Sequence, residues 1–238
     1  MFIGRLTLRK IQKEASQAST FVFEKPQATW LAGQHFMFFK PHFPFDLRGI
    51  TRVFTISSAP GQDFLSLTTR YFNDTSSSFK RVLFCMQPGD RLWAFGPSPI
   101  FDYFRALDAD KEYVFLTGGI GITPVMATLR HHAELSGNLK ATVIYANRDH
   151  EVIFKDELDS LQAGMASLAI NYITSPQHID AAVIEEAAGS YCAPTFIVSG
   201  SRRFVDGMVA LLRGGLGVQR NSIIADKFRA IPLSGGGI

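Results

Sequence analysis

Apolar and polar residues alternate in short runs through the first hundred residues of this chain. Six such runs cover residues 6–11, 20–24, 35–40, 52–57, 64–72 and 90–95. Turn sequences separate several of them, such as Ala-Pro-Gly and Gln-Pro-Gly-Asp, and one short amphipathic segment at 77–86 interrupts the series. Because alternation bounded by turn residues is typical of half-buried strands, the pattern predicts an antiparallel six-stranded β-barrel.

The pattern changes after the Pro-rich link at 96–99. Apolar runs without polar alternation follow, as expected of strands buried on both faces, at 113–117, 141–146, 168–173, 195–199 and 222–225. Helical spacing lies between them, for example at Phe154, Leu158 and Leu161. Strands that alternate with helices predict a doubly wound parallel sheet. We therefore expect two domains, a barrel over residues 1–100 and an α/β domain over residues 108–238.

Composition and charge exclude several classes of protein. The net charge is +3 and the basic residues are scattered, so no nucleic-acid partner is expected. No apolar stretch approaches about eighteen residues and the N-terminus quickly returns to charge, so neither membrane insertion nor a signal peptide is expected and a cytoplasmic location is the default.

The titratable side chains outside the motifs predict no metal site. Two cysteines cannot supply an all-cysteine iron–sulfur centre or a zinc ribbon. Cys85 and Cys192 could form one disulfide, but two buried free thiols are the favoured interpretation. The adjacent His131 and His132 would point in different directions on a helix. The acidic residues near 156–159 are expected on the solvated face of a helix.

Three glycines lie in the sequence TGGIGITP, between the first strand of the predicted α/β domain and a helix: Gly118, Gly119 and Gly121. Glycine can adopt a positive φ and lets another molecule approach the main chain. Thr123 is expected to be the N-cap of the helix and Pro124 its first residue. The free amides of the first turn would then suit an anion such as a pyrophosphate. The full dinucleotide fingerprint is absent, since its third glycine would fall at Pro124.

Two motifs together resemble the ferredoxin–NADP⁺ reductase superfamily. RVFTISS at 52–58 resembles its Arg-x-Tyr-Ser/Thr flavin motif, and GGIGITP at 118–124 is similar to its Gly-Gly-x-Gly-x-Thr-Pro nicotinamide-dinucleotide motif. YANRDHEVIFKDEL at 145–158 is similar to a further stretch of the family. The resemblance covers nearly the whole chain. It implies an FAD-binding barrel and an NAD(P)-binding α/β domain, without an iron–sulfur domain.

The resemblance implies how the barrel would hold a flavin. Arg52 would pair with a flavin phosphate through charge-assisted hydrogen bonds worth roughly 1.5–3 kcal/mol each. Phe54 replaces the usual tyrosine and would stack on the flavin, while Thr55 would lie beside the hydride-exchanging N5 and is assigned a catalytic role. Other candidates for flavin binding are Val53, Arg70, Ser77, Ser78 and Phe79. The two serines could equally be plain N-caps. FAD is favoured over FMN because this combination serves two phosphates better than one.

The resemblance also implies a nicotinamide site on the α/β domain. VSGSRRFVDGM at 198–208 aligns with the family sequence Cys-Gly-Pro-x-x-Met, so Ser199 replaces the cysteine that borders the nicotinamide and is the second catalytic candidate. An aromatic residue can cover the flavin near the end of the family sequence, here Phe228. The expected dinucleotide contacts are Thr117, Gly118, Gly119, Gly121, Thr123, Pro124, Arg148, Gly200 and Ser201.

The choice between NADH and NADPH is weakly signalled. Relatives that use NADP tend to carry an arginine where this chain has Pro176, which favours NADH. Arg148, Arg202 and Arg203 could supply the missing cation for the 2′-phosphate of NADPH.

These inferences predict an NAD(P)H-dependent flavoprotein reductase. Hydride would pass from NAD(P)H to bound FAD, and electrons would continue to a separate acceptor such as ferredoxin, flavodoxin, a partner subunit or a small molecule. One alternative is a flavin-binding electron-transfer subunit or sensor without NAD(P)H turnover of its own, because the sequence around Ser199 departs from the family pattern. A weaker alternative is a scaffold without a cofactor.

Overall fold

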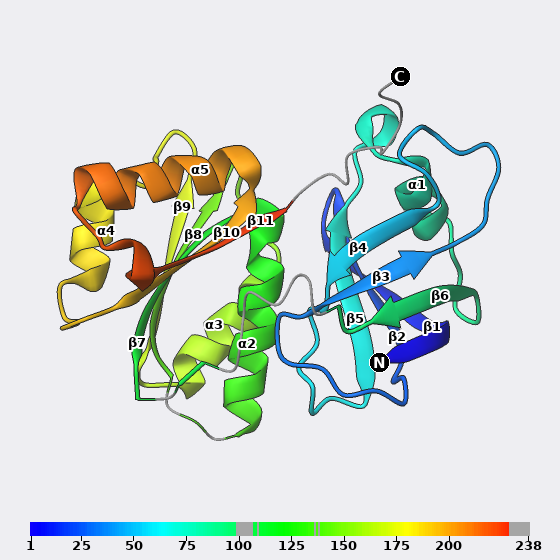
Figure 1. Ribbon diagram of the computed structural model, residues 1–238, viewed down its shortest axis with the longest axis horizontal. Coiled ribbons are helices and arrows are strands. Elements are labelled where there is room, and N and C mark those ends of the chain that lie inside the picture. Colours follow the sequence, from blue (N-terminus) through cyan, green and yellow to red (C-terminus); the bar gives the residue numbers. More distant parts are fainter. Residues whose placement is uncertain (99–106, 109, 136, 138, 229–238) are drawn as a thin grey trace.

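The N-terminal half of the chain forms an antiparallel barrel (Figure 1). The computed structural model describes residues 1–98, 107–108, 110–135, 137 and 139–228. The strands pair in the order β4-β3-β6-β1-β2-β5, and an isolated bridge between Ile56 and Leu67 joins the chain after β4 to β5. The six strands are β1 (Phe2–Ala15), β2 (Ala18–Glu24), β3 (His35–Phe39), β4 (Thr51–Thr55), β5 (Phe64–Arg70) and β6 (Arg91–Gly96). The predicted six-stranded barrel is confirmed.

An aromatic core fills the barrel. The side chains of Phe21, Phe23, Phe36 and Phe38 are fully buried on the inward faces of β2 and β3. Between β5 and β6 the chain forms η1 (Asn73–Thr75) and the short helix α1 (Ser78–Phe84). Part of the high phenylalanine content therefore reflects the packing of this small barrel.

The C-terminal half is a five-stranded sheet whose pairs are all parallel, in the order β11-β10-β7-β8-β9. Its strands are β7 (Glu112–Gly118), β8 (Lys140–Asn147), β9 (Leu168–Thr174), β10 (Thr195–Ser201) and β11 (Ile223–Phe228). The helical elements are η3 (Gly119–Gly121), α2 (Ile122–Glu134), α3 (Lys155–Gly164), α4 (Ala181–Ala188), α5 (Arg202–Ala210), the π-helical turn η4 (Leu211–Gly215) and η5 (Arg220–Ser222). The predicted doubly wound sheet is confirmed, although the sequence pattern did not single out α4.

Helices cover both faces of this sheet. One buried cluster joins α2 and α3 to one face through residues such as Met126, Phe115 and Leu158. A second cluster joins α4 and α5 to the other face through residues such as Ile184 and Val205. Figure 1 shows the two helix pairs on opposite sides of the sheet, with α2 nearest the barrel.

The first strand of the sheet in chain order, β7, lies at its centre. From β7 the chain winds outward to β8 and β9 on one side, and then crosses to β10 and β11 on the other. In open α/β sheets, ligands bind beyond the carboxyl ends of the strands at such a reversal of strand order. The glycine loop leaves β7 at this point.

Two other expectations concern the cysteines and membranes. Cys85 and Cys192 are free, but both are exposed, so the prediction of buried thiols is wrong. Cys85 ends α1 in the barrel, whereas Cys192 lies in the loop before β10. Within the part of the chain that the structure describes, no helix is long and apolar enough to cross a membrane.

Candidate active site

β4 carries the aromatic and hydroxyl residues that the sequence predicts for the flavin. The ring of Phe54 is half-buried and packs against the rings of Phe38 and Phe79, at centroid distances of 5.9 and 6.0 Å. Thr55 is buried, and its Oγ1 lies 2.9 Å from His35 Nε2. The hydroxyl of Thr55 therefore has a fixed partner on β3.

Arg52 presents a buried donor that has no acceptor among the described residues. Its Nη1 donates to the main-chain carbonyls of Arg48 and Thr51. Its Nη2 lies 3.9 Å from Asp46 Oδ1 and makes no hydrogen bond with any described residue. Burial lowers the pKa of Arg52, but a guanidinium stays protonated in proteins. The free N–H groups of this cation are available to an anion.

Asp46, from the loop between β3 and β4, binds the start of α1. Its carboxylate accepts hydrogen bonds from Ser78 N at 2.8 Å and from Arg48 N and Nε at 2.9 and 3.1 Å. Burial raises the pKa of Asp46, but these hydrogen bonds outweigh that effect and hold the pKa below its usual value. An ionised side chain therefore lies where the sequence predicts a flavin phosphate.

The two predicted serines are both engaged in this structure. Ser77 is the N-cap of α1, and its Oγ accepts a hydrogen bond from Lys80 N at 3.3 Å. Ser78 Oγ lies 2.9 Å from His42 Nε2 and accepts a hydrogen bond from Asp46 N at 3.1 Å. The plain capping role left open for Ser77 is thus the one that the structure shows.

Positive charge gathers around the start of α1. Lys80 Nζ donates to Arg70 O at 2.9 Å, and burial, followed by the charges of Arg52 and Arg48, lowers the pKa of Lys80 to about 8. Arg70 Nε is buried and has no hydrogen-bond partner among the described residues. Mutual repulsion and unpaired donors are relieved when a ligand brings negative charge. If Asp46 moves away, these residues fit the diphosphate of FAD.

The glycine loop allows two backbone segments to approach each other. A Cβ on Gly121 would lie 2.3 Å from the carbonyl oxygen of Ser199, and one on Gly118 would lie 2.9 Å from the Phe204 ring. Of the three glycines in this loop, only Gly119 has a positive φ, 54°. Gly118 and Gly121 have negative φ angles, so the positive φ that glycine permits is not what these two positions require. They instead allow close packing against α5 and β10, respectively.

Helix α2 starts two residues earlier than predicted. Gly121 is its N-cap, so Thr123 and Pro124 are the second and third helical residues and the predicted N-cap is wrong. Thr123 Oγ1 donates to Ile120 O at 3.2 Å instead of capping the helix. Proline still loses nothing there, because N–H groups in the first turn have no partner within a helix. Gly121 has no side chain to cap these amides, and the N–H of Ile122 already donates to the carbonyl oxygens of Gly119 and Ile120 in η3. The amides of this turn that η3 leaves free suit an anionic ligand.

Three buried polar side chains form a row across the carboxyl end of the sheet. Thr117 of β7 pairs in register with Ser199 of β10, which pairs with Asp226 of β11. Thr117 Oγ1, Ser199 Oγ and Asp226 Oδ2 have no hydrogen-bond partner among the described atoms. Burial raises the pKa of Asp226 to about 7, and the nearby Ser199 hydroxyl lowers it by less. This row can both donate hydrogen bonds to a ligand and accept them.

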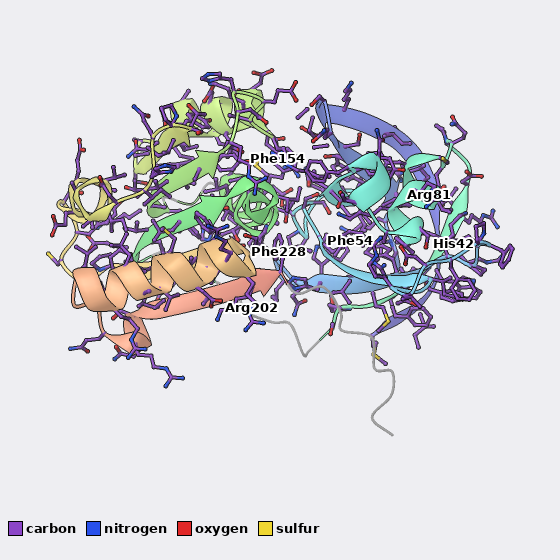
Figure 2. All side chains as sticks on the ribbon, turned by 90° about the horizontal axis from the view of Figure 1, so that it is seen from above. His42, Phe54, Arg81, Phe154, Arg202 and Phe228 are labelled. Carbon is purple, nitrogen blue, oxygen red and sulfur yellow. The ribbon has the colours of Figure 1, made fainter. Side chains whose placement is uncertain are left out.

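The remaining candidates on the α/β domain lie along the same edge. Gly200, with φ 152°, packs against Gly118, while Ser201 Oγ accepts a hydrogen bond from Phe204 N at 3.3 Å and caps α5. Phe228 pairs in register with Ser201 at the end of β11. Figure 2 shows Phe228 on one side of the boundary between the two halves and Phe54 on the other.

Two candidates lie apart from these clusters. Arg148 is exposed just beyond the end of β8. Val53 pairs with Met37 of β3, on the face of β4 opposite to Arg52 and Phe54, since successive strand residues point to opposite faces.

Sequence reasoning missed several residues of these clusters, namely His35, Asp46, Arg48, Lys80 and Asp226. The only clear sequence signal among them is Asp226, a carboxylate inside the apolar run SIIADKF. Such a residue in a buried strand needs a reason to be there. The others depend on contacts between segments far apart in the chain.

Comparison with known proteins identifies related sequences for both halves. Residues 115–209 match the family model of the oxidoreductase NAD-binding domain. The chain is 31% identical over 169 residues to the ferredoxin reductase component of 3-ketosteroid-9-alpha-monooxygenase from Mycolicibacterium smegmatis, a match that covers 66% of this chain and 46% of that protein. It is 25% identical over 238 residues to ferredoxin–NADP reductase B from Sorangium cellulosum, covering 93% of this chain and 91% of that one.

A solved structure shares the fold. The ferredoxin NADP⁺ reductase from Neisseria gonorrhoeae, with bound FAD and NADP, matches with a TM-score of 0.74 and 20% identity. The match covers 94% of this chain and 98% of that one. The matched region spans about half the length of the Mycolicibacterium protein, at 46%.

Proposed function

We propose that this chain is a member of the ferredoxin–NADP reductase-like superfamily of FAD- and NAD-binding oxidoreductases and that it is an NAD(P)H-dependent flavoprotein reductase. Residues 1–100 would bind FAD and residues 108–238 would bind NAD(P)H. When bound, FAD would accept hydride and pass electrons onward. The proposal is carried by the buried, unpartnered polar atoms in both halves, from Arg52 Nη2 on β4 to the row of Thr117, Ser199 and Asp226.

The residues of the barrel have separate proposed roles. Arg52, Arg70 and Lys80 bind the diphosphate through charge-assisted hydrogen bonds. Phe54 stacks on the flavin, and Thr55, whose hydroxyl His35 orients, contacts the edge where hydride arrives. Ser77, Ser78 and Phe79 shape the start of α1, and Val53 supports β4 from its other face. Diphosphate binding requires Asp46 to move from Ser78 N.

The α/β domain would hold the second cofactor at the carboxyl edge of its sheet. The main chain at Gly118, Gly119 and Gly121 and the first-turn amides of α2 bind the pyrophosphate of NAD(P)H. Thr117 and Ser199 position the nicotinamide by hydrogen bonds, and Phe228 covers the flavin. Thr123 and Pro124 shape the first turn of α2, and Gly200 and Ser201 shape the loop that enters α5.

We propose FAD over FMN and NADH over NADPH. Several cations, Arg48, Arg52, Arg70 and Lys80, lie near the start of α1, which suits two phosphates better than one. The position expected to bind a 2′-phosphate carries Pro176, although the exposed residues Arg148, Arg202 and Arg203 leave NADPH as a second donor.

The acceptor would lie outside these residues. Two cysteines, one in each half, cannot hold a four-thiolate cluster. The Mycolicibacterium relative is the ferredoxin reductase component of an oxygenase. We therefore propose a separate redox protein as the acceptor, with a small molecule as the other candidate.

Anaerobic mixing of the FAD-loaded protein with NADH tests the proposal. Bleaching of the flavin absorption supports a reductase, whereas a bound flavin that stays oxidised identifies a flavin-binding module. Failure of the purified protein to bind FAD at all overturns the proposal.

Replacement of Arg52 tests the flavin site separately. Arg52→Met should weaken FAD binding about ten- to a hundredfold, because each lost charge-assisted hydrogen bond is worth roughly 1.5–3 kcal/mol. Arg81→Met, at an exposed position on α1, is the matched control (Figure 2). Equal FAD affinity in both variants would contradict the assignment of Arg52.

A further inference from the structure

Arg130, on α2, joins the two halves of the molecule. Its Nη1 donates to the carbonyl oxygen of Ser57, in the barrel, at 2.6 Å. Its Nε and Nη2 donate to the two carboxylate oxygens of Glu157, on α3, at 2.7 and 2.6 Å. The Arg130 side chain is only 12% exposed. The Glu157 side chain, expected from the sequence to lie on a solvated helix face, is 42% exposed and also orients this cation at the boundary.

The atom that Arg130 holds is itself fixed within the barrel. Ser57 is fully buried two residues after Thr55, and its N–H donates to Ser66 O at 2.8 Å. Its Oγ lies 2.9 Å from Ser66 Oγ and 3.0 Å from Thr68 Oγ1 on β5. Ser57 is therefore held firmly to β5, two residues after the end of β4, the strand that carries Arg52, Phe54 and Thr55.

Other groups at the boundary converge on the same guanidinium. The Arg130 guanidinium carbon lies 5.0 Å from the centre of the Phe154 ring. Phe154 has a φ of 63°, an unfavourable backbone conformation that persists where the surroundings enforce it. On the barrel side, burial raises the pKa of the Glu14 carboxyl, and the nearby charge of Arg130 opposes this shift in part.

Helix α2 connects this contact to the glycine loop. Arg130 lies eight residues after Ile122, where the helix leaves Gly121, so the two points are about 12 Å apart along the axis at about 1.5 Å per residue. One end of this helix therefore carries the proposed pyrophosphate site, while Arg130, nearer its other end, is hydrogen-bonded to Ser57, two residues after Thr55. A tilt about the Ser57 contact would move one cofactor relative to the other.

We propose that Arg130 is a positioning residue that fixes the α/β domain on the barrel and thereby sets the geometry of hydride transfer. This inference rests on the proposed reductase function. A misplacement of about 1 Å between reacting groups can lower a rate about a hundredfold. Arg130 itself touches neither proposed cofactor site; it acts through Ser57 and α2.

The first experiment measures hydride transfer in single turnovers of the FAD-loaded protein with saturating NADH and with C4-deuterated NADH. Arg130→Met should lower the isotope-sensitive rate at least about tenfold while the FAD content stays unchanged. Arg130→Lys, which keeps one donor, should recover part of the rate. Arg9→Met removes an exposed ion pair of the barrel, Arg9 with Asp63 at 3.1 Å, and serves as the matched control with an unchanged rate.

The second experiment measures domain orientation without any chemistry. The two free, exposed cysteines lie one in each half, so spin labels on Cys85 and Cys192 report the distance between the halves. Arg130→Met should broaden the distance distribution of the full chain, and so should Glu157→Gln, which weakens the pairing that orients Arg130. Arg9→Met should leave it narrow.

The two experiments separate the possible failures. A distance distribution that stays narrow in folded Arg130→Met overturns the inference, whatever happens to thermal stability. A broadened distribution with an unchanged transfer rate overturns it as well. If the wild-type flavin is never reduced by NADH, the reductase function fails, and the positioning role in hydride transfer is overturned with it, while the distances still show whether Arg130 fixes the domains.

Discussion

The Ser78 amide donates a 2.8 Å hydrogen bond to the Asp46 carboxylate, so a loop between two barrel strands closes over the start of α1. The same carboxylate binds Arg48 and lies 3.9 Å from Arg52. Arg52 is one of the donors proposed for the flavin diphosphate, and the Arg48 side chain and the Ser78 amide lie at the same place. The side chain and the ligand would therefore compete for one set of hydrogen-bond donors.

Removal of the charge on Asp46 should strengthen FAD binding. In Asp46→Asn the loop keeps a side chain of the same shape, but the repulsion between carboxylate and phosphate disappears, which at partly exposed sites is worth about 1 kcal/mol, or roughly fivefold in affinity. Fluorescence titration of the flavin-free protein would measure the change. Asp63→Asn, at an exposed position, is the control, and weaker FAD binding by Asp46→Asn would contradict competition.

Lys80 should make FAD binding depend on pH. Burial, with Arg52 and Arg48 nearby, lowers its pKa to about 8 before the ligand binds. A bound diphosphate favours the charged amine and raises that pKa, so binding takes up a proton and affinity falls as pH rises through about 8. Titrations of FAD at several pH values would show this trend, and Lys80→Met should flatten it. An affinity that rises above about pH 8 in the wild type would refute the coupling.

Asp226 should destabilise the fold as the pH rises. Its pKa is about 7 when folded and 3.8 as an ordinary carboxyl, so between these values the folded state holds a proton that the unfolded state lacks. Stability is lost through this window, by roughly 4 kcal/mol at most, since one pKa unit is about 1.4 kcal/mol. The free energy of unfolding of Asp226→Asn should therefore exceed that of the wild type at about pH 8 but not at about pH 4. Chemical unfolding at the two pH values would measure this difference.

An exposed carboxylate offers the opposite sign as a control. A hydrogen bond from Lys227 lowers the pKa of Asp206, so this group contributes stability that is present above the ordinary carboxyl pKa and is lost as the pH falls. Asp206→Asn should not gain stability at high pH. Parallel behaviour of the two variants would show that burial of Asp226 is not the cause.

Gly121 should tolerate no side chain. A Cβ there would lie 2.3 Å from the Ser199 carbonyl oxygen, so Gly121→Ala should destabilise the protein by about 1–3 kcal/mol through displaced backbone. Gly207, within α5, has open space around its Cα, and Gly207→Ala should stabilise the protein by about 0.5–1 kcal/mol. Thermal unfolding of the pair measures both. Equal destabilisation would argue against the close approach at Gly121.

The fold could be read from local patterns because each strand carries its own signal. Alternation in residues 90–95 predicts a strand with one face in the barrel core, and the residues of β6 do alternate between exposed or half-buried and buried positions. The uninterrupted apolar run at 113–117 predicts a strand buried on both faces, as β7 is. The start of α2 was misplaced by two residues because Thr123 has the chemistry of a cap, whereas packing against Ser199 decides where the helix begins.

The candidate site was only partly accessible from the sequence. Arg52 and the glycine loop lie in recognisable motifs, but Asp46 and Arg130 act through contacts with residues 32 and 73 positions away in the chain. No local pattern encodes such pairings. The exposure of Cys85 and Cys192 likewise depends on which surfaces the tertiary packing leaves uncovered.

The central place of β7 in its sheet has a consequence for how this protein can change. Because strand order alone puts the glycine loop where the winding reverses, the place where a ligand is expected to bind does not depend on the side chains that border it. A serine at position 199 thus changes the side chain that a ligand would contact but not the position at which the ligand would bind. Single substitutions at this edge could therefore change ligand specificity while the strand order and backbone of the sheet are retained.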